Sequence, residues 1–221
     1  SITSPAAAAS PRAAAVRVVP AWQIVTESAS PASRTAVFVD ARSGEVVATR
    51  EDLRFLTGTL HYQAPTRGPQ AHSDFPARGA HFLVDNSQSS ADEAGQYTVD
   101  PAPATLSCFA SSDLINVFNA AGDPASLAFT PQDGADVVWS LADDEQGDAQ
   151  LSGFVHASIA KATAREIDPT MKFLDDTLQV RVNQQDDNYV CNAFWNGVTL
   201  NFFVKYQICN NTARVADVID H

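Results

Sequence analysis

The residues best suited to chemistry lie near the end of the printed sequence. Residues 212–221 carry apolar side chains at helical spacing, so we expect a helix there. Asp217 and His221 would then lie one turn apart on the same face of that helix. Taken alone, a terminal His complements the helix dipole or is exposed at a frayed end, and a lone Asp on a helix is a solvated residue.

A second unusual segment, Asn192-Ala193-Phe194-Trp195, precedes His221 by about thirty residues. An isolated run of this kind is more often a core strand than a binding site. The remaining histidines (His61, His72, His81 and His156) show no ligand spacing, and we expect them to be structural or surface residues.

Other chemistries find little support in the sequence. It has no G-x-S-x-G elbow, no Gly-rich phosphate loop, no C-x-x-C pair and no basic stripe. The Asp pairs at 143/144, 175/176 and 186/187 are sequence neighbours whose side chains point apart in any regular element. They resemble solubilising loop residues more than a glycosidase pair.

The three cysteines allow two interpretations. Cys191 and Cys209 bracket a hairpin-like segment, and a disulfide between them would stabilise the chain by about 3 kcal/mol by restricting its unfolded state. Cys108 would then be buried and reduced, or paired with a residue outside this sequence. The alternative is three free buried thiols.

The composition is that of a globular protein, with 45% hydrophobic and 9% aromatic residues. A formal charge of −12 favours solubility and argues against nucleic acid and anionic membranes as partners. No apolar run approaches the roughly 20 residues that span a bilayer. Because an initiating Met and a signal-like segment are absent, we expect the sequence to begin inside a longer chain.

Four regions follow from the pattern along the chain. Residues 1–15 are rich in Ala and broken by Pro, which is typical of a linker or frayed remnant. Residues 16–56 contain three predicted strands (21–25, 36–40 and 45–49), with Gly44 in the turn between the last two. Residues 57–141 are β-rich, with short predicted strands separated by turn residues, as in a sandwich or meandering sheet.

In residues 142–221 the spacing of the apolar residues changes from that of strands to that of a helix. Apolar residues from Leu151 to Ile167 form one stripe of an amphipathic helix, with Asp148 as the expected N-cap and Asp168-Pro169 as the stop. Strands follow at 178–182 and 198–204. In the final helix we expect three side chains to face the core: Val215, Val218 and Ile219. The fold class is therefore α+β.

The segment Asn192-Ala193-Phe194-Trp195-Asn196-Gly197, followed by Asp217-Val218-x-x-His221, resembles the thermolysin/fungalysin group of secreted zinc metalloendopeptidases. Residues 21–47 resemble the end of the propeptide that precedes such catalytic domains, and the helix near 151–167 resembles the helix that crosses their N-terminal lobe. The resemblance is thin over 57–141, which is either an insertion or a separate sandwich-like element.

The resemblance implies a β-rich zincin-type lobe preceded by a small propeptide sheet. His221 would be the first His of H-E-x-x-H and bind zinc, with the catalytic Glu and the two other ligands missing from this sequence. Asp217 would help to bind calcium. Asn192 and Ala193 would bind the peptide or protein substrate, which would add to their strand as a further strand. Phe194 and Trp195 would pack beneath the cleft.

These assignments predict a fragment of a secreted protease that hydrolyses peptide bonds with zinc-activated water, inactive as given, with its propeptide acting in cis. The alternative is a non-catalytic extracellular β-sandwich that binds or adheres, in which His221 is incidental. A third hypothesis gives residues 1–52 an inhibitory or chaperone role of their own.

Overall fold

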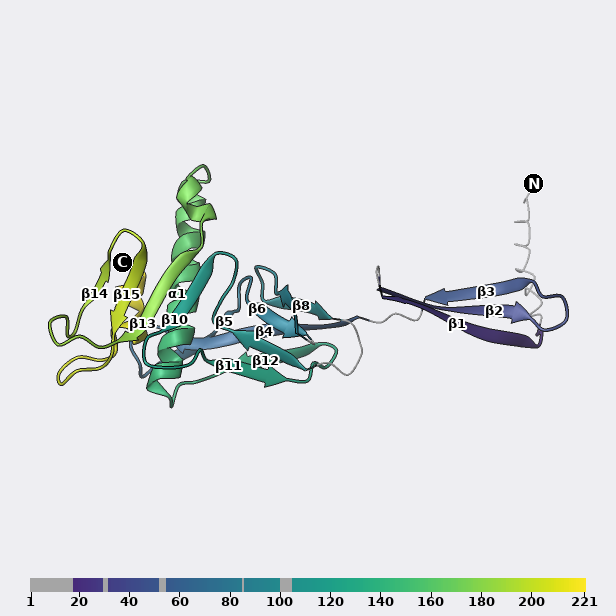
Figure 1. Ribbon diagram of the computed structural model, residues 1–221, viewed down its shortest axis with the longest axis horizontal. Coiled ribbons are helices and arrows are strands. Elements are labelled where there is room, and N and C mark those ends of the chain that lie inside the picture. Colours follow the sequence, from purple (N-terminus) through teal and green to yellow (C-terminus); the bar gives the residue numbers. More distant parts are fainter. Residues whose placement is uncertain (1–17, 30–31, 52–54, 85, 100–104) are drawn as a thin grey trace, which may run out of the picture. The chain divides into compact units, whose positions relative to one another are not determined.

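The computed structural model describes residues 18–29, 32–51, 55–84, 86–99 and 105–221 (Figure 1). The chain divides into two compact units, Ser1–Leu53 and Arg54–His221, and each is described by itself. The boundary between the two units follows residue 53, three residues before the end of the region 16–56 that was expected from the sequence. The expected linker, residues 1–15, lies outside the described residues.

The N-terminal unit is a three-stranded antiparallel sheet in the order β1-β2-β3 (Ala21–Ala29, Ala32–Asp40 and Val46–Glu51). The turn between β2 and β3 is held by Asp40, whose carboxylate accepts hydrogen bonds from the backbone N–H of Arg42 (2.8 Å) and Ser43 (3.2 Å). Gly44 takes a φ of +75°, a left-handed conformation that side chains disfavour. All three strands and the Gly turn were predicted from the sequence.

The second unit contains two sheets built from the region 57–141. One has the order β12-β4-β5, with β8 also paired to β4, and the other has the order β11-β9-β6-β7. Their strands are β4 (Leu56–Pro65), β5 (His72–Pro76), β6 (His81–Val84), β7 (Ser87–Ser90), β8 (Gln96–Val99), β9 (Leu106–Phe109), β11 (Ser126–Phe129) and β12 (Ala135–Trp139). Sequence patterning missed β5 and β7, because their polar residues give no apolar alternation.

These two sheets share a buried aromatic core. The Tyr62 hydroxyl of β4 donates to the Phe109 carbonyl of β9 at 2.6 Å, and the rings of Phe82 and Tyr97 meet at 6.1 Å. The rings of Tyr62, Phe82 and Tyr97 are almost fully buried. Side chains of the two sheets therefore pack against each other.

A third sheet, here called the terminal sheet, joins this region to the rest of the unit. Its order is β10-β13-β15-β14, made of Ile115–Asn119, Leu178–Gln184, Thr199–Phe203 and Ala193–Trp195. β10 runs parallel to β13, so residues 57–141 contribute a strand to the same sheet as the C-terminal residues. β13 changes register before Gln184, where Asn183 has a φ of +59°.

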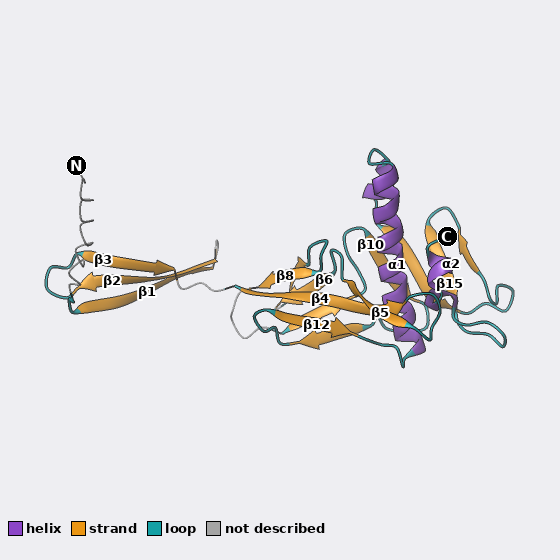
Figure 2. Cartoon of the chain, turned by 180° about the vertical axis from the view of Figure 1, so that it is seen from behind, coloured by secondary structure: helices purple, strands orange, loops and turns teal. Residues whose placement is uncertain are grey.

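The long helix α1 (Glu145–Ile167) packs on β4, on the terminal sheet and on the short helical segments near the C-terminus (Figure 2). It begins four residues earlier than expected. Asp144 is the N-cap, and its carboxylate accepts from the Gln146 N–H at 3.1 Å. The prediction of Asp148 as N-cap was wrong, because the preceding acidic run supplies a cap one turn earlier. The stop at Asp168 is confirmed.

α1 is not a simple amphipathic helix. Every residue from 147 to 157 is buried, because both sides of this half of the helix are covered. Gly153 allows close approach to the terminal sheet, since a Cβ there would lie 3.2 Å from Val182 and 3.3 Å from Val180. At the other end, the predicted stripe fails: Ile167 is 80% exposed.

The predicted helix at 212–221 is broken in two. A 3-10 turn, η2 (Thr212–Arg214), is followed by the short helix α2 (Ala216–Ile219), with Val215 extended between them at a φ of −118°. The Ala216 N–H donates to the Arg67 carbonyl at 2.9 Å, a tertiary bond that sequence periodicity does not reveal. Ile219 is buried as expected and Val215 is half-buried, but Val218 is exposed.

The disulfide expected between Cys191 and Cys209 is confirmed, and Cys108 is free and buried on β9. Burial raises the pKa of the Cys108 thiol to about 12. Its thiolate population is therefore negligible at neutral pH.

We expect no fast-reacting thiol in the native protein, because Cys108 is buried and protonated. A disulfide-exchange reagent such as Ellman's reagent at pH 8 should label one thiol per chain after unfolding in denaturant without reductant. Adding a reductant before the reagent should expose all three cysteines. Three thiols without reductant would contradict the Cys191–Cys209 pairing.

Candidate functional site

A groove of about 450 Å³ lies between β14 and α2. The strand side is formed by Ala193, Phe194 and Trp195, with Leu200 and Phe202 of β15. The helix side is formed by Asp217, Val218, Ile219 and His221. The structure thus places most of the predicted site residues around one hollow, although 24 positions separate Ala193 from Asp217 in the chain.

β14 is the edge strand of the terminal sheet, so one of its sides has no strand partner among the described residues. It pairs antiparallel with β15, and the Asn196 N–H donates to the Thr199 carbonyl. In an antiparallel ladder hydrogen-bonded pairs alternate, so Phe194 is the next residue bonded to β15. Ala193 and Trp195 therefore direct their backbone N–H and C=O groups toward the open edge.

The aromatic side chains of β14 are half-covered rather than buried beneath the cleft. Phe194 is 37% exposed and packs against Tyr189 and Phe203, with ring centroids 5.7 and 6.0 Å away. Trp195 is 43% exposed and meets Phe173 edge-on at 6.1 Å. Both residues line the groove. Because successive side chains of a strand point to opposite faces, Trp195 lies on the face of Leu200, and the Phe194 ring lies on the face of Phe203.

Asn192 does not line the groove. Its side-chain oxygen accepts from the backbone N–H of Ala193 at 2.8 Å, and its carbonyl accepts from the Thr212 hydroxyl at 2.9 Å. The carboxamide thus occupies one of the two N–H groups at the open edge. An incoming strand would have to displace it to reach that donor.

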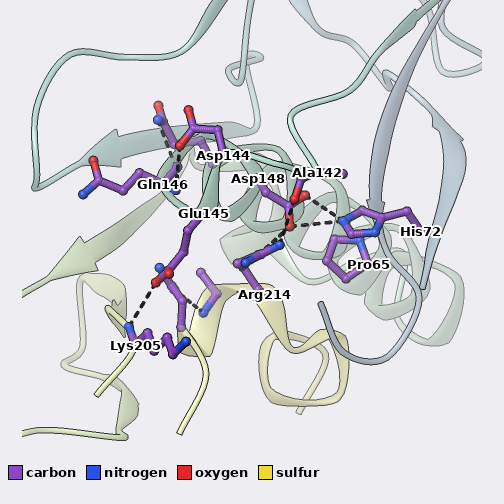
Figure 3. Close-up of polar contacts among 12 residues, drawn as sticks. Pro65, His72, Ala142, Asp144, Glu145, Gln146, Asp148, Lys205 and Arg214 are labelled. Atoms are coloured by element: carbon purple, nitrogen blue, oxygen red, sulfur yellow. Dashed lines mark hydrogen bonds and ion pairs between the residues drawn. The ribbon is translucent and has the colours of Figure 1, made fainter. Parts of the chain in front are cut away.

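The helix side of the groove is held in place by a buried carboxylate (Figure 3). Asp148, in the first turn of α1, is fully buried. It accepts from the Arg214 Nε of η2 at 2.6 Å and lies 3.0 Å from the His72 Nε2 of β5. The Arg214 Nη2 also donates to the Ala142 carbonyl at 3.1 Å. The pair thereby ties η2 to the start of α1.

A second contact ties α1 to the end of α2. His156 is buried, with Nε2 2.7 Å from the Pro65 carbonyl and Nδ1 3.4 Å from the Asp220 carboxylate. Because a carbonyl can only accept, Nε2 carries a hydrogen. Burial raises the pKa of Asp220, and the neighbouring His156 opposes that rise. Asp220 directly precedes His221, so this contact also restricts the position of the exposed imidazole.

Two further links join the walls of the groove. The Thr212 hydroxyl accepts from the Phe203 N–H at 2.8 Å and reaches the Asn192 carbonyl. The Cys191–Cys209 disulfide, with Cα atoms 5.6 Å apart, connects the residue before Asn192 to the approach of η2. The start of β14, the end of β15 and η2 are therefore held together.

The described residues at the groove do not make up a complete metal site. Within the part of the chain that the structure describes, no group of three or more His, Cys, Asp or Glu side chains is placed to hold a metal ion. His221 is exposed at the groove. Asp217 is mostly exposed and lies 3.6 Å from Arg67 Nε, so its carboxylate has an ion-pair partner.

The structure also shows residues whose roles sequence reasoning missed. His72 and His156 were expected to be structural or surface residues, and both are structural, but their partners Asp148, Arg214 and Asp220 were not identified. These partners are distant in sequence, so no local spacing could reveal them. The burial of Asp148 is apparent only in the packed structure, so the sequence carried no usable signal for these contacts.

Comparison with protein-family models, curated proteins and solved structures found no match to this chain. Among the described residues, no helix is both long enough and apolar enough to cross a membrane.

Replacing Arg214 by Met tests how strongly the buried carboxylate holds the groove. Arg214→Met leaves Asp148 with His72 as its remaining side-chain partner, and we expect the free energy of unfolding in urea to fall by about 3 kcal/mol. Hydrogen exchange should quicken at the amides of η2 and α2.

The matched control is Arg78→Met, because Arg78 forms only an exposed pair with Glu93 at 3.5 Å. The free energy of unfolding of this variant should fall by less than about 1 kcal/mol. Equal losses in the two variants would show that the Asp148–Arg214 pair has no special role.

Proposed function

We propose that this chain is the substrate-binding and first zinc-binding part of a secreted zinc metalloendopeptidase. The observation that carries the proposal is the shared groove: the edge strand Ala193–Trp195 and the exposed imidazole of His221 line the same hollow. A peptidase needs both an extended binding edge for the substrate and a metal ligand beside it.

The proposed substrate is an extended peptide that adds to β14 as a further strand. The outward backbone groups of Trp195 and the Ala193 carbonyl would bond to its main chain, and the Ala193 N–H would do so after the peptide displaces the Asn192 carboxamide. Leu200, Phe202 and Trp195 form an apolar floor for its side chains. His221 and Asp217 lie on the opposite wall, beside the bound peptide.

A single imidazole is an incomplete zinc site, since catalytic zinc takes three protein ligands. We therefore propose that the other two ligands and the general base come from residues outside this sequence. Bound zinc would supply an activated water for hydrolysis of the peptide bond. The role of this chain is to orient the peptide and to contribute the ligand His221. A calcium role for Asp217 belongs to the same proposal.

The N-terminal sheet is proposed to be the end of a propeptide that acts in cis. Secretion agrees with the Cys191–Cys209 disulfide, because such bonds persist mainly in oxidising compartments. The alternative function is a non-catalytic extracellular binding or adhesion module. The two sheets built from 57–141, whose aromatic side chains pack together, favour it, since β-sandwiches are common in cell-surface proteins.

Peptide binding at the groove can be measured directly on residues 1–221. An extended pentapeptide with apolar side chains should shift the NMR amide signals of Ala193 and Trp195, because their N–H groups face the open edge. The same peptide with N-methylated amides cannot donate main-chain hydrogen bonds, so it should bind far more weakly. Equal binding of both peptides, or shifts confined to other sheets, would reject strand addition at β14.

Zinc uptake by residues 1–221 should be weak, because the described residues offer one exposed imidazole at the groove and no ligand cluster. Calorimetric titration with zinc should show no saturation at stoichiometric concentrations. His221→Ala should reduce the remaining uptake, whereas His81→Ala should not. Tight stoichiometric binding would contradict the proposal that further ligands lie outside this sequence.

A further inference from the structure

A second, larger hollow lies away from the groove. Its volume is about 660 Å³, and it is enclosed by the C-terminal half of α1, the residues leading into β10, the 3-10 helix η1 (Lys172–Asp175) and the turn that contains Ala91. Apolar side chains form much of its wall, among them Leu114, Ile115, Ala162 and Leu174. This volume lies within the range of cavities that hold small organic ligands, roughly 300–1,000 Å³.

One charged side chain in this wall stands out. Lys161 of α1 is only 8% exposed, and its Nζ donates to the backbone carbonyls of Leu114 (3.2 Å) and Asp176 (2.5 Å). An ammonium group has three hydrogens to donate, so one is left without a partner among the described residues. Neither of its two partners is a carboxylate side chain, so the hydrogen bonds of the ammonium reach only neutral carbonyls.

The other charges around the cavity already have partners. Arg165 pairs with Asp175 at 2.7 Å, Arg78 with Glu93 at 3.5 Å, and His81 with Asp113 at 2.9 Å. Burial lowers the pKa of Lys161, and the nearby Arg165 adds to that lowering, whereas Asp176 and Asp175 oppose it. One further acceptor at the remaining hydrogen of Nζ would therefore stabilise the buried ammonium.

We propose that this cavity binds a small amphipathic carboxylate. The carboxylate accepts a charge-assisted hydrogen bond from the free position on the Lys161 Nζ, and the apolar body of the ligand packs on Leu114, Ala162 and Leu174. A cation of the same shape is repelled by Lys161 and Arg165. This site is separate from the groove, and the inference does not depend on the proposed peptidase function.

The test uses residues 1–221 and two probes with the same alkyl chain, decanoate and decyltrimethylammonium, each below its micelle-forming concentration. Decanoate should bind with one-to-one stoichiometry in calorimetry. It should shift the NMR amide signals of Ser158, Ala162 and Leu174, which line the cavity. Decyltrimethylammonium should bind at least about tenfold more weakly, because a charged hydrogen bond is lost and repulsion is added.

Lys161→Met keeps the length of the side chain and removes its charge, and should weaken decanoate binding about tenfold or more. Lys172→Met makes the same chemical change at an exposed η1 position outside the cavity wall, and should leave binding within about twofold. Ala162→Leu retains Lys161 but fills part of the cavity, so it should also weaken binding and keeps the test open if Lys161→Met does not fold.

Three outcomes would overturn the inference. One is the absence of decanoate binding to the unaltered chain, and the second is equal binding of the two probes. The third is unchanged decanoate affinity in a folded Lys161→Met or Ala162→Leu variant.

Discussion

The buried carboxylate of Asp148 is the interaction on which the geometry of the groove depends. A fully buried charge is tolerated only when it is paired and hydrogen-bonded, and here Arg214 and His72 supply the partners. The three side chains come from α1, η2 and β5, so one charge fixes three elements that are distant in sequence. η2 leads directly into α2 and His221, and the pair thereby sets where the imidazole lies.

The opposite wall depends on a different constraint, the position of β14 at the edge of the terminal sheet. β15 satisfies one side of its backbone and leaves Ala193 and Trp195 with groups directed outward. Thr212 and the Cys191–Cys209 disulfide join this strand to η2. The two walls are therefore parts of one cross-linked assembly around α1.

Much of this fold could be predicted from local signals. The Gly44 turn, most strands with apolar alternation, the end of α1 at Asp168 and the disulfide all follow from short-range chemistry. The polar strands β5 and β7 could not be found in this way, because tertiary pairing rather than pattern defines them. The break before α2 has the same origin, since the Ala216 N–H bonds to a carbonyl of a distant loop.

The candidate site, too, could be predicted only in part from the sequence. Residue types and the resemblance pointed to Ala193, Phe194, Trp195, Asp217 and His221, and the fold brings these five residues to one groove. Asn192 was assigned to the substrate, but its side chain bonds to its own strand. The residues that hold the site together, Asp148, His72 and Arg214, gave no usable pattern because each is separated from the others by more than sixty positions. Lys161 was hidden for a related reason, since only the packed structure reveals that a helix lysine is buried.

The most direct measurement is endopeptidase activity of the protein expressed from its complete gene, assayed on an unfolded protein substrate with and without a zinc chelator. If His221 is a zinc ligand beside the peptide edge, the chelator and His221→Ala should each abolish hydrolysis. His81→Ala, which alters a histidine on a different sheet, should retain hydrolysis. Full activity in His221→Ala, or no hydrolysis by the unaltered protein, would contradict the peptidase assignment and favour the binding module.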